Sequence, residues 1–235
     1  MEWLYNIDAL KLMDVLIERN VKVDLLVTDP PYDIPVINGG GSINTVKKLN
    51  ASLTDLTRSN LMTSYDIRTF GEKLFMLQKG NINAYFWCNK KQIPEYLQYY
   101  VLEKNCKFDQ LPWHKTNALP TYSNKYLSDT EYCLYFRKGK GHCFPQNYED
   151  AKTYMIGPIN QADKKLWKHP TIKPLNYIEK MVRNSSKEGE LVFDPFMGSG
   201  TTGVACKKLG RNFIGGDLDP EWCRVAKERI NTAKL

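Results

Sequence analysis

The chain has 235 residues, of which 42% are hydrophobic and 25% are charged. These values fit one globular domain, and no apolar run approaches the roughly 18 residues of a membrane span. The net charge of +7 favours a polyanionic partner such as nucleic acid, although a basic chain can also be merely soluble. The six cysteines show no C-x-x-C spacing, so we expect reduced thiols and no metal site. The first residues lack a secretion signal, which favours a cytoplasmic protein.

Apolar strand-like runs alternate with longer amphipathic stretches, which indicates an α/β fold. The first half is expected to contain a strand (2–5), a helix (9–19), a buried strand (23–28), a polar loop (33–62), a helix (65–78), a strand (83–88), a helix (93–103) and two strands (107–114 and 131–137). A stretch without clear period (137–168) is followed by a helix (176–185), a strand (191–193), a helix (201–209), a strand (212–216) and a closing helix (220–232). Seven strands in this arrangement predict a single domain, 1–235, with a doubly wound, mostly parallel, Rossmann-like sheet.

A glycine-rich turn joins the predicted strand at 191–193 to the next helix. Residues 194–203 read Asp-Pro-Phe-Met-Gly-Ser-Gly-Thr-Thr-Gly. Gly198 and Gly200 let backbone approach a ligand closely, and N–H groups at a helix start favour a carboxylate or phosphate. Asp217 ends the following strand, where its carboxylate can accept both hydroxyls of a ribose. The glycine spacing also fits a dinucleotide fingerprint, and a turn without any ligand is a further alternative.

A second motif, Asp29-Pro30-Pro31-Tyr32, follows the buried strand at 23–28. Open α/β sheets bind ligands at this end of their strands. The exocyclic amine of adenine is a poor nucleophile because its lone pair is delocalised into the ring. Acceptors on Asp29 and on the Pro30 carbonyl would bind both amine hydrogens and free the lone pair, while Tyr32 would stack on the base. The base must first leave the duplex; a rigid turn that only ends a core strand is the alternative.

The two motifs, in this order, resemble the DNA amino-methyltransferases, which methylate N6 of adenine or N4 of cytosine. The catalytic motif precedes the cofactor motif, as in the circularly permuted group called β, and the resemblance covers nearly the whole chain. Shorter segments are also similar to the family pattern, at residues 5–10, with Ile7 in place of the usual Gly, and at 113–117, 130–139, 169–174 and 213–219. The segment at 2–5 is expected to complete the cofactor half of the sheet beside the strands at 191–193 and 212–216.

The resemblance implies that the cofactor is S-adenosylmethionine. The cofactor-binding residues that it implies are Asp8, Ala9, Asp29, His169, Thr171, Lys173, Asp194, Pro195, Phe196, Gly198, Ser199, Gly200, Thr201, Asp217 and Leu218. The catalytic residues that it implies are Asp29, Pro30, Pro31 and Tyr32. Asp29 favours adenine, since family members that act on cytosine N4 more often carry Ser there. Cytosine N4 methylation, a catalytically silent DNA-binding protein and a dinucleotide oxidoreductase remain the alternatives.

Basic and aromatic residues are frequent between 138 and 168, which we interpret as a small target-recognition insertion rather than a solvated, mobile one. The loop at 33–62 is expected to be mobile and to close over the flipped base. The expected DNA contacts are Lys47, Lys48, Lys115, Asn117, Arg137, Lys138, Lys140, Lys164, Lys165 and Lys168. The expected partner is double-stranded DNA; a homodimer, a cognate restriction endonuclease and a bacterial or phage source are further expectations from the resemblance.

Overall fold

The computed structural model describes residues 1–31, 65–120, 124–159, 161–168 and 171–234. The loop expected at 33–62 therefore lies outside the described residues, as do Tyr32, Lys47, Lys48 and His169. None of the described helices combines the length and the apolar character that crossing a membrane requires.

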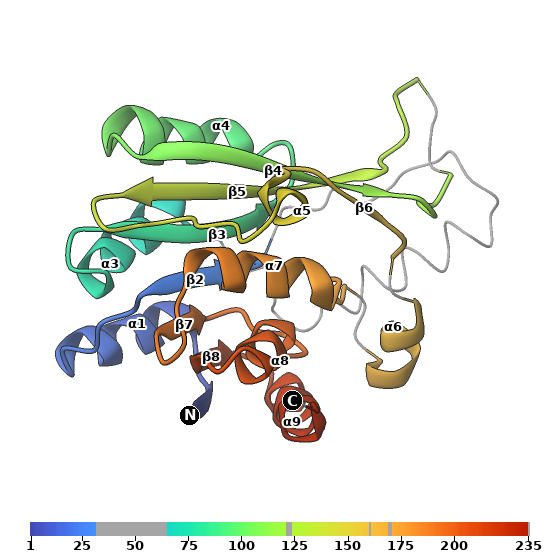
Figure 1. Cartoon of the computed structure of the whole chain (residues 1–235). Coiled ribbons are helices and arrows are strands. Elements are labelled where there is room, and N and C mark those ends of the chain that lie inside the picture. Colours follow the sequence, from blue (N-terminus) through green and yellow to red (C-terminus); the bar gives the residue numbers. More distant parts are fainter. Residues whose placement is uncertain (32–64, 121–123, 160, 169–170, 235) are drawn as a thin grey trace.

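One eight-stranded sheet, in the order β1-β8-β7-β2-β3-β5-β4-β6, runs through the described part of the chain (Figure 1). Its strands are β1 (Glu2–Asn6), β2 (Leu25–Thr28), β3 (Ile82–Cys88), β4 (Lys107–Lys115), β5 (Thr130–Lys138), β6 (Met155–Gly157), β7 (Leu191–Asp194) and β8 (Asn212–Asp217). Neighbouring strands are parallel except where β5 pairs with β3 and β4. The predicted mostly parallel, doubly wound fold is thereby confirmed.

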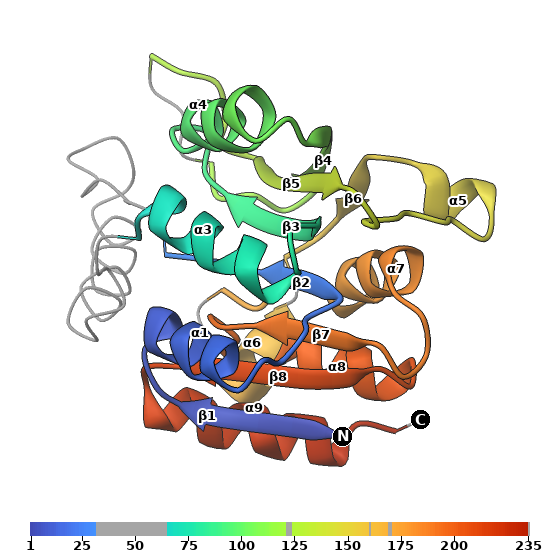
Figure 2. The same cartoon turned by 90° about the vertical axis from the view of Figure 1, so that its left-hand side faces the viewer.

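Helices cover both faces of the sheet (Figure 2). One face carries α1 (Ala9–Glu18), α3 (Ile67–Leu77) and α4 (Ile93–Tyr96) with the π-helical turn η1 (Leu97–Glu103). The other face carries α7 (Leu175–Ser185), α8 (Thr201–Lys208) and α9 (Pro220–Thr232). All seven residues of β3 are buried, as expected for a strand covered on both faces.

The starts of several helices follow from capping residues in the sequence. The side chain of Asp8 accepts a hydrogen bond from the backbone N–H of Lys11 at the start of α1, and Asp66 caps α3 in the same way. Asp219 caps α9, whose first residue is Pro220. Aspartate at the N-cap satisfies a donor that the helix leaves unpaired, and proline at the first position costs no hydrogen bond.

The stretch at 137–168, in which no period was expected, contains regular structure. It forms α5 (Tyr148–Ala151), β6 and α6 (Gln161–Trp167). Elements of this length are too short to show a hydrophobic period, so the sequence did not reveal them. Met155 of β6 is buried opposite Trp113 of β4, and this pairing adds the eighth strand to a sheet for which seven were predicted.

The helix predicted at 93–103 changes character midway. After α4, the chain continues as η1, in which the N–H of Lys104 reaches back to the carbonyl of Tyr99. Tyr96, Tyr99 and Tyr100 are all buried here. The wider π-helical turn occurs where these tyrosines pack. The pattern of polar and apolar residues in the sequence does not distinguish such a turn from an α-helix.

The first strand of the chain lies at the edge of the sheet beside the last one. Residues 2 to 6 of β1 pair in parallel with residues 213 to 217 of β8. Because β8 in turn pairs with β7, the opening segment completes the half of the sheet that carries the glycine-rich turn. This confirms the strand order expected for the permuted chain.

Candidate active site

Four aspartates gather where neighbouring parallel strands end. Asp8 follows β1, Asp217 ends β8, Asp194 ends β7 and Asp29 follows β2. Since these four strands are consecutive in the sheet and parallel, their carboxyl ends form one edge. Ligand sites of open α/β folds lie at this edge, which we call the carboxyl edge.

Asp194 is buried, and its carboxylate accepts hydrogen bonds from neighbouring elements of the structure. The hydroxyls of Thr28 and Thr202 donate to its two carboxylate oxygens, each at 2.7 Å, and the N–H of Phe196 donates at 3.2 Å. Burial raises the pKa of Asp194 to about 7, while these donors act in the opposite direction. These hydrogen bonds connect β7 with β2 and with the start of α8, so Asp194 stabilises the glycine-rich turn from the side of the protein interior.

Asp217 anchors the glycine-rich turn from the neighbouring strand. Its carboxylate accepts hydrogen bonds from the backbone N–H groups of Gly198 and Asp219, both at 2.9 Å. Burial raises its pKa to about 6. Each carboxylate oxygen retains a further lone pair, so a ribose hydroxyl can still donate to Asp217.

The turn has the backbone that its glycines allow. Gly198 and Gly200 adopt φ values of 47° and 78°, in the left-handed region. A Cβ on Gly200 would lie 2.8 Å from the Cβ of Ala226 in α9, so this glycine permits close approach of a helix. Arg229 of α9 is buried and donates to Ser199 Oγ at 2.9 Å and to Thr201 Oγ1 at 2.8 Å. The turn is therefore fixed by α9 as well as by Asp217.

Asp29 lies in a chain of alternating charges. Lys173 forms an ion pair with Asp29 and also lies 3.3 Å from Glu131, which in turn pairs with Lys115. The ammonium of Lys173 sits 5.1 Å from the centre of the Trp87 ring. Burial by itself would raise the pKa of Glu131, but the two lysines hold it at about 2.

The groups at the carboxyl edge fit S-adenosylmethionine by their chemistry. The carboxylates of Asp8, Asp217 and Asp29 are acceptors suited to ribose hydroxyls and to a ligand that carries positive charge. The N–H groups at the start of α8 suit its carboxylate. Pro195, Ser199 and Thr201 are buried around the turn, whereas Phe196 packs on Phe70 with ring centres 6.0 Å apart.

Five further predicted cofactor or catalytic residues, among those that the structure describes, lie within two residues of these groups along the chain. Ala9 is the first residue of α1, directly after Asp8, and Leu218 follows Asp217 and is exposed. Thr171 is exposed two residues before Lys173. Pro30 is buried next to Asp29, and the carbonyl of Pro31 accepts from Gln92 at 3.4 Å.

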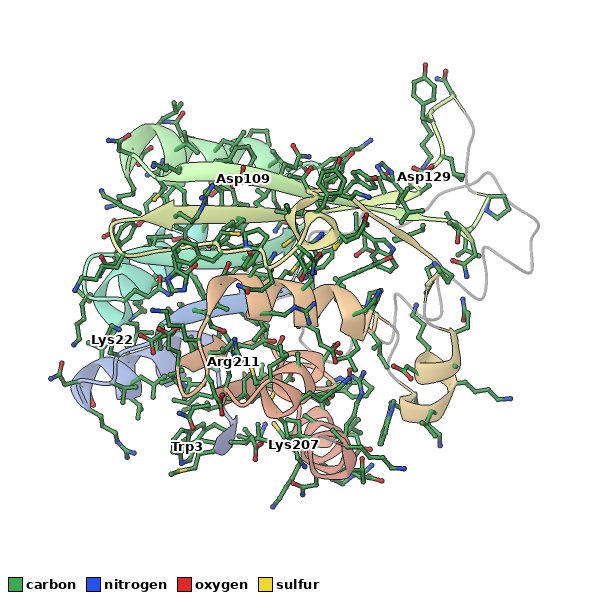
Figure 3. The ribbon with its side chains drawn as sticks, viewed as in Figure 1. Trp3, Lys22, Asp109, Asp129, Lys207 and Arg211 are labelled. Atoms are coloured by element: carbon green, nitrogen blue, oxygen red, sulfur yellow. The ribbon has the colours of Figure 1, made fainter. Side chains whose placement is uncertain are left out.

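The predicted DNA contacts that lie among the described residues fall into two groups. Arg137 and Lys138 end β5, an antiparallel strand, and therefore lie at the opposite end of the sheet with Lys140. Arg137 pairs with Asp109, and Lys138 donates to the carbonyl of Lys104. Asp109 lies far along the sheet from Asp129, which directly precedes β5 (Figure 3).

The second group lies near the carboxyl edge. Lys115 ends β4, and Asn117 binds the backbone of Ile159 through both its amide atoms. Lys164 and Lys165 belong to α6, and Lys168 follows that helix. Burial lowers the pKa of Lys164, whose charge lies near Glu131 and Lys115. In Figure 1, α6 lies on the same side of the molecule as the β4–β5 connection.

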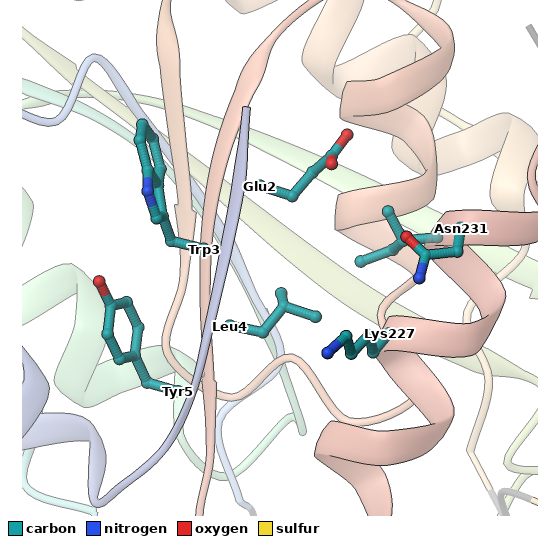
Figure 4. A pocket seen from close by; sticks show the side chains of 7 residues that line it. Glu2, Trp3, Leu4, Tyr5, Lys227 and Asn231 are labelled. Atoms are coloured by element: carbon teal, nitrogen blue, oxygen red, sulfur yellow. The ribbon is translucent and has the colours of Figure 1, made fainter.

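A separate cavity of 310 Å³ opens at the edge of the sheet, between β1 and α9 (Figure 4). Glu2 and Leu4 point from β1 toward Lys227 and Asn231, whereas Trp3 and Tyr5 point to the other side of the strand. None of the predicted site residues lines this cavity. The four aspartates and the glycine-rich turn lie instead at the carboxyl edge.

Sequence reasoning missed several residues that shape the site. The side chains of Glu131 and Trp87 contact Lys173, and the side chain of Arg229 donates to Thr201; the partners in each pair lie far apart in the chain. The hydroxyls of Thr28 and Thr202 both donate to Asp194. One signal was available for Arg229, which interrupts an apolar helical stripe. A buried charge at such a position needs a partner, which here is the glycine-rich turn.

Comparison with known proteins agrees with this geometry. A family model described as DNA methylase, of the N6 and N4 type, matches residues 23–228. The type II methyltransferase M2.LlaDCHI of Lactococcus lactis subsp. cremoris is 31% identical, over 97% of this chain and 88% of that protein. The type II methyltransferase M2.DpnII of Streptococcus pneumoniae is 30% identical, over 88% and 82% respectively.

One similar solved structure contains S-adenosylmethionine. The complex of M1.HpyAVI with S-adenosylmethionine superposes with a TM-score of 0.71 and 28% identity, covering 98% of this chain and all of that one. Its fold, its cofactor and the carboxylate-lined edge of the present sheet are mutually consistent. The chain belongs to the DNA methylase family and is an S-adenosylmethionine-dependent DNA methyltransferase of restriction-modification type.

Proposed function

We propose that the protein is a site-specific methyltransferase that modifies N6 of an adenine flipped out of double-stranded DNA. The observation that carries this proposal is the position of Asp29-Pro30-Pro31 directly beyond β2, beside the strands that end in Asp194 and Asp217. An acceptor for the target amine thus lies next to the groups that suit the cofactor.

When bound, S-adenosylmethionine would supply an electrophilic methyl group. As the lone pair on the target nitrogen forms a bond to the methyl carbon, the S–CH3 bond would break and S-adenosylhomocysteine would leave with the bonding electrons; the methylated nitrogen would then lose one proton to water. Asp29 accepts one hydrogen of the amine and the Pro30 carbonyl accepts the other, so that the lone pair is withdrawn from the ring. The fixed backbone of the two prolines positions these acceptors in advance, which lowers the entropic part of the barrier. Tyr32, directly after the prolines, would stack on the extruded base.

Methylation of cytosine N4 is the second candidate, because the matching family includes both types. Asp at position 29 supports adenine, since Ser is more frequent there in enzymes that act on cytosine. The same residues would act on either base, because both carry an exocyclic amine conjugated with a ring.

The type II relatives support a role in a restriction-modification system, with a cognate endonuclease as partner. We also propose that the protein acts in the cytoplasm of a bacterium or of a phage-infected cell. A homodimer would let two copies share recognition of a short site. The basic residues of α6 and the segment at 33–62 are the proposed contacts with DNA in addition to Lys115 and Asn117.

The proposal is tested by incubating mixed-sequence unmethylated DNA with radiolabelled S-adenosylmethionine, followed by nucleoside digestion and mass analysis. The expected product is N6-methyladenine. N4-methylcytosine would retain the chemistry but reverse the choice of base. A protein that binds the cofactor yet labels no DNA would contradict the proposed activity.

A further inference from the structure

A row of alternating charges, partly shielded from water, runs along the carboxyl edge from the end of β2 to the end of β4, and we call it the charge row. Its members are Asp29, Lys173, Glu131 and Lys115. The side chains of Lys173, Lys115, Asp29 and Glu131 are only 8%, 14%, 25% and 27% exposed. Interactions between charges shielded in this way are stronger than between surface charges, because little water screens them.

Glu131 reaches the charge row because β5 is antiparallel to its neighbours. The strand begins, rather than ends, at the carboxyl edge, and residue 131 pairs with Trp113 there. One carboxylate oxygen of Glu131 lies 3.3 Å from the ammonium of Lys173, and the other pairs with Lys115. A residue outside both recognised motifs thus contacts the lysine that contacts Asp29.

Lys173 is held on three sides. Asp29 and Glu131 bind its ammonium, and the face of Trp87 lies 5.1 Å away. Taking an ammonium out of water costs several kcal/mol unless opposite charges and good geometry compensate. With Glu131 in place the ammonium has a second anion, so its position does not depend on Asp29 alone.

We propose that Glu131 is a positioning residue for methyl transfer, which holds Lys173 against Asp29 so that the Asp29 carboxylate keeps one orientation toward the target amine. This inference rests on the proposed function of Asp29. It differs from a purely structural role, because the effect of Glu131 on the rate must pass through Lys173.

A double-mutant cycle measures that dependence. The variants are Glu131→Gln, Lys173→Met and the two combined, and the readouts are the single-turnover rate of methyl transfer to DNA and the dissociation constant of S-adenosylmethionine. Glu131→Gln is expected to slow the single-turnover rate by about 10²-fold, since a displacement of about 1 Å in an acceptor can cost that much. The cofactor affinity should change by less than about threefold, a difference of under 1 kcal/mol.

In the Lys173→Met background, Glu131→Gln should slow the reaction by less than about threefold further, because coupled residues are not additive. A control is Glu179→Gln, which removes a partly buried carboxylate paired with Lys208 between α7 and α8, away from Asp29. That variant should retain the wild-type rate. If Glu131→Gln does not fold, Glu131→Asp keeps the charge one methylene further away and enters the same cycle.

The outcomes separate the inference from the proposed function. An active wild type in which Glu131→Gln has full activity, or loses the same factor with and without Lys173, would overturn the positioning role alone. A wild type that labels no DNA would overturn the proposed function and the inference together. Loss of rate only while Lys173 is present, with cofactor binding retained, supports the role of Glu131.

Discussion

Asp29 is the residue on which the proposed chemistry depends. Asp29→Ala removes the carboxylate that would accept the amine hydrogen, so methyl transfer is expected to fall below detection. The groups at Asp217 and the glycine-rich turn remain, and cofactor affinity should stay largely intact. Labelled methyl transfer and calorimetric binding of S-adenosylmethionine measure the two quantities separately. Full activity of Asp29→Ala would show that another group acts on the amine.

The buried carboxyl of Asp194 predicts an unusual dependence of stability on pH. Its pKa is raised from the ordinary value of 3.8 to about 7, so between these pH values the folded protein retains a proton that the unfolded chain has released. The free energy of unfolding should therefore fall as the pH rises through this window, by up to about 1.4 kcal/mol for each unit of pKa difference. Above pH 7 the loss is complete.

Asp194→Asn tests this dependence because asparagine does not titrate. Denaturant unfolding at pH 5 and pH 8 should show a smaller difference for the variant than for the wild type. The stability of the variant should still be somewhat lower at pH 8 than at pH 5, because burial also raises the pKa of Asp217, to about 6. Equal pH dependence in both proteins would mean that Asp194 is already ionised at pH 5.

At the scale of elements, the start of α8 and the side of α9 are in close contact at Gly200. Gly200→Ala places a methyl group 2.8 Å from the Cβ of Ala226 and also imposes a left-handed conformation on alanine. Gly80→Ala is the matched control, because Gly80 has a φ of 80° and nothing lies within 4 Å of the added Cβ. The control isolates the backbone cost, about 1–2 kcal/mol.

Gly200→Ala should lower the free energy of unfolding by a further 1–3 kcal/mol or so, the usual cost of overpacking. Chemical denaturation of the two variants beside the wild type measures the difference. Equal losses at both positions would show that α8 and α9 can separate at no cost. The left-handed backbone would then be the sole reason for glycine at position 200.

The elements that the sequence revealed are those with a strong local signal. The buried run around Val27, the helix after Asp8 and the Gly198–Gly200 turn each specify their structure within a few residues, and all three were predicted. The three-residue strand β6 was missed because pairing with β4, rather than a pattern of its own, makes it a strand. Short elements of this kind depend on the tertiary context.

In the candidate site, too, the residues with a local signal were predicted and the long-range contacts were not. Asp29, Asp194 and Asp217 could be assigned to one edge because the carboxyl ends of parallel strands converge there. The contacts of Glu131 with Lys173, and of Arg229 with Ser199, join segments far apart in the chain. No local pattern encodes such pairs, so only the folded structure shows them.

On the scale of the whole molecule, the net charge of +7 predicts salt-sensitive DNA binding, and the structure suggests where it originates. Lys165 and Lys168 are exposed at α6, near the carboxyl edge, whereas Lys107 and Lys140 are exposed at the opposite end of the sheet. Lys165→Ala with Lys168→Ala should weaken binding. The slope of log affinity against log salt should become shallower by about 0.9 for each DNA phosphate that the variant no longer neutralises.

Lys107→Ala with Lys140→Ala removes the same charge from the other end and serves as the control. Titration of duplex DNA at several salt concentrations should give the wild-type slope for this pair. A larger effect at Lys107 and Lys140 than at Lys165 and Lys168 would place the DNA on the opposite end of the sheet. A flat salt response of the wild type would remove phosphate contacts as the source of affinity.

The pairing of β1 with β8 has a consequence for the newly made chain. Asn6 binds the backbone of Asp217, 211 positions later, so β1 emerges from the ribosome long before its neighbour exists. At about 5–20 residues per second, this delay is on the order of 10–40 seconds. During that interval Asp8 and Asp29 have been translated, but the strands that bring Asp194 and Asp217 beside them have not. The carboxyl edge can therefore assemble only after β8 has been translated, and a nascent fragment that lacks β8 cannot form the complete edge.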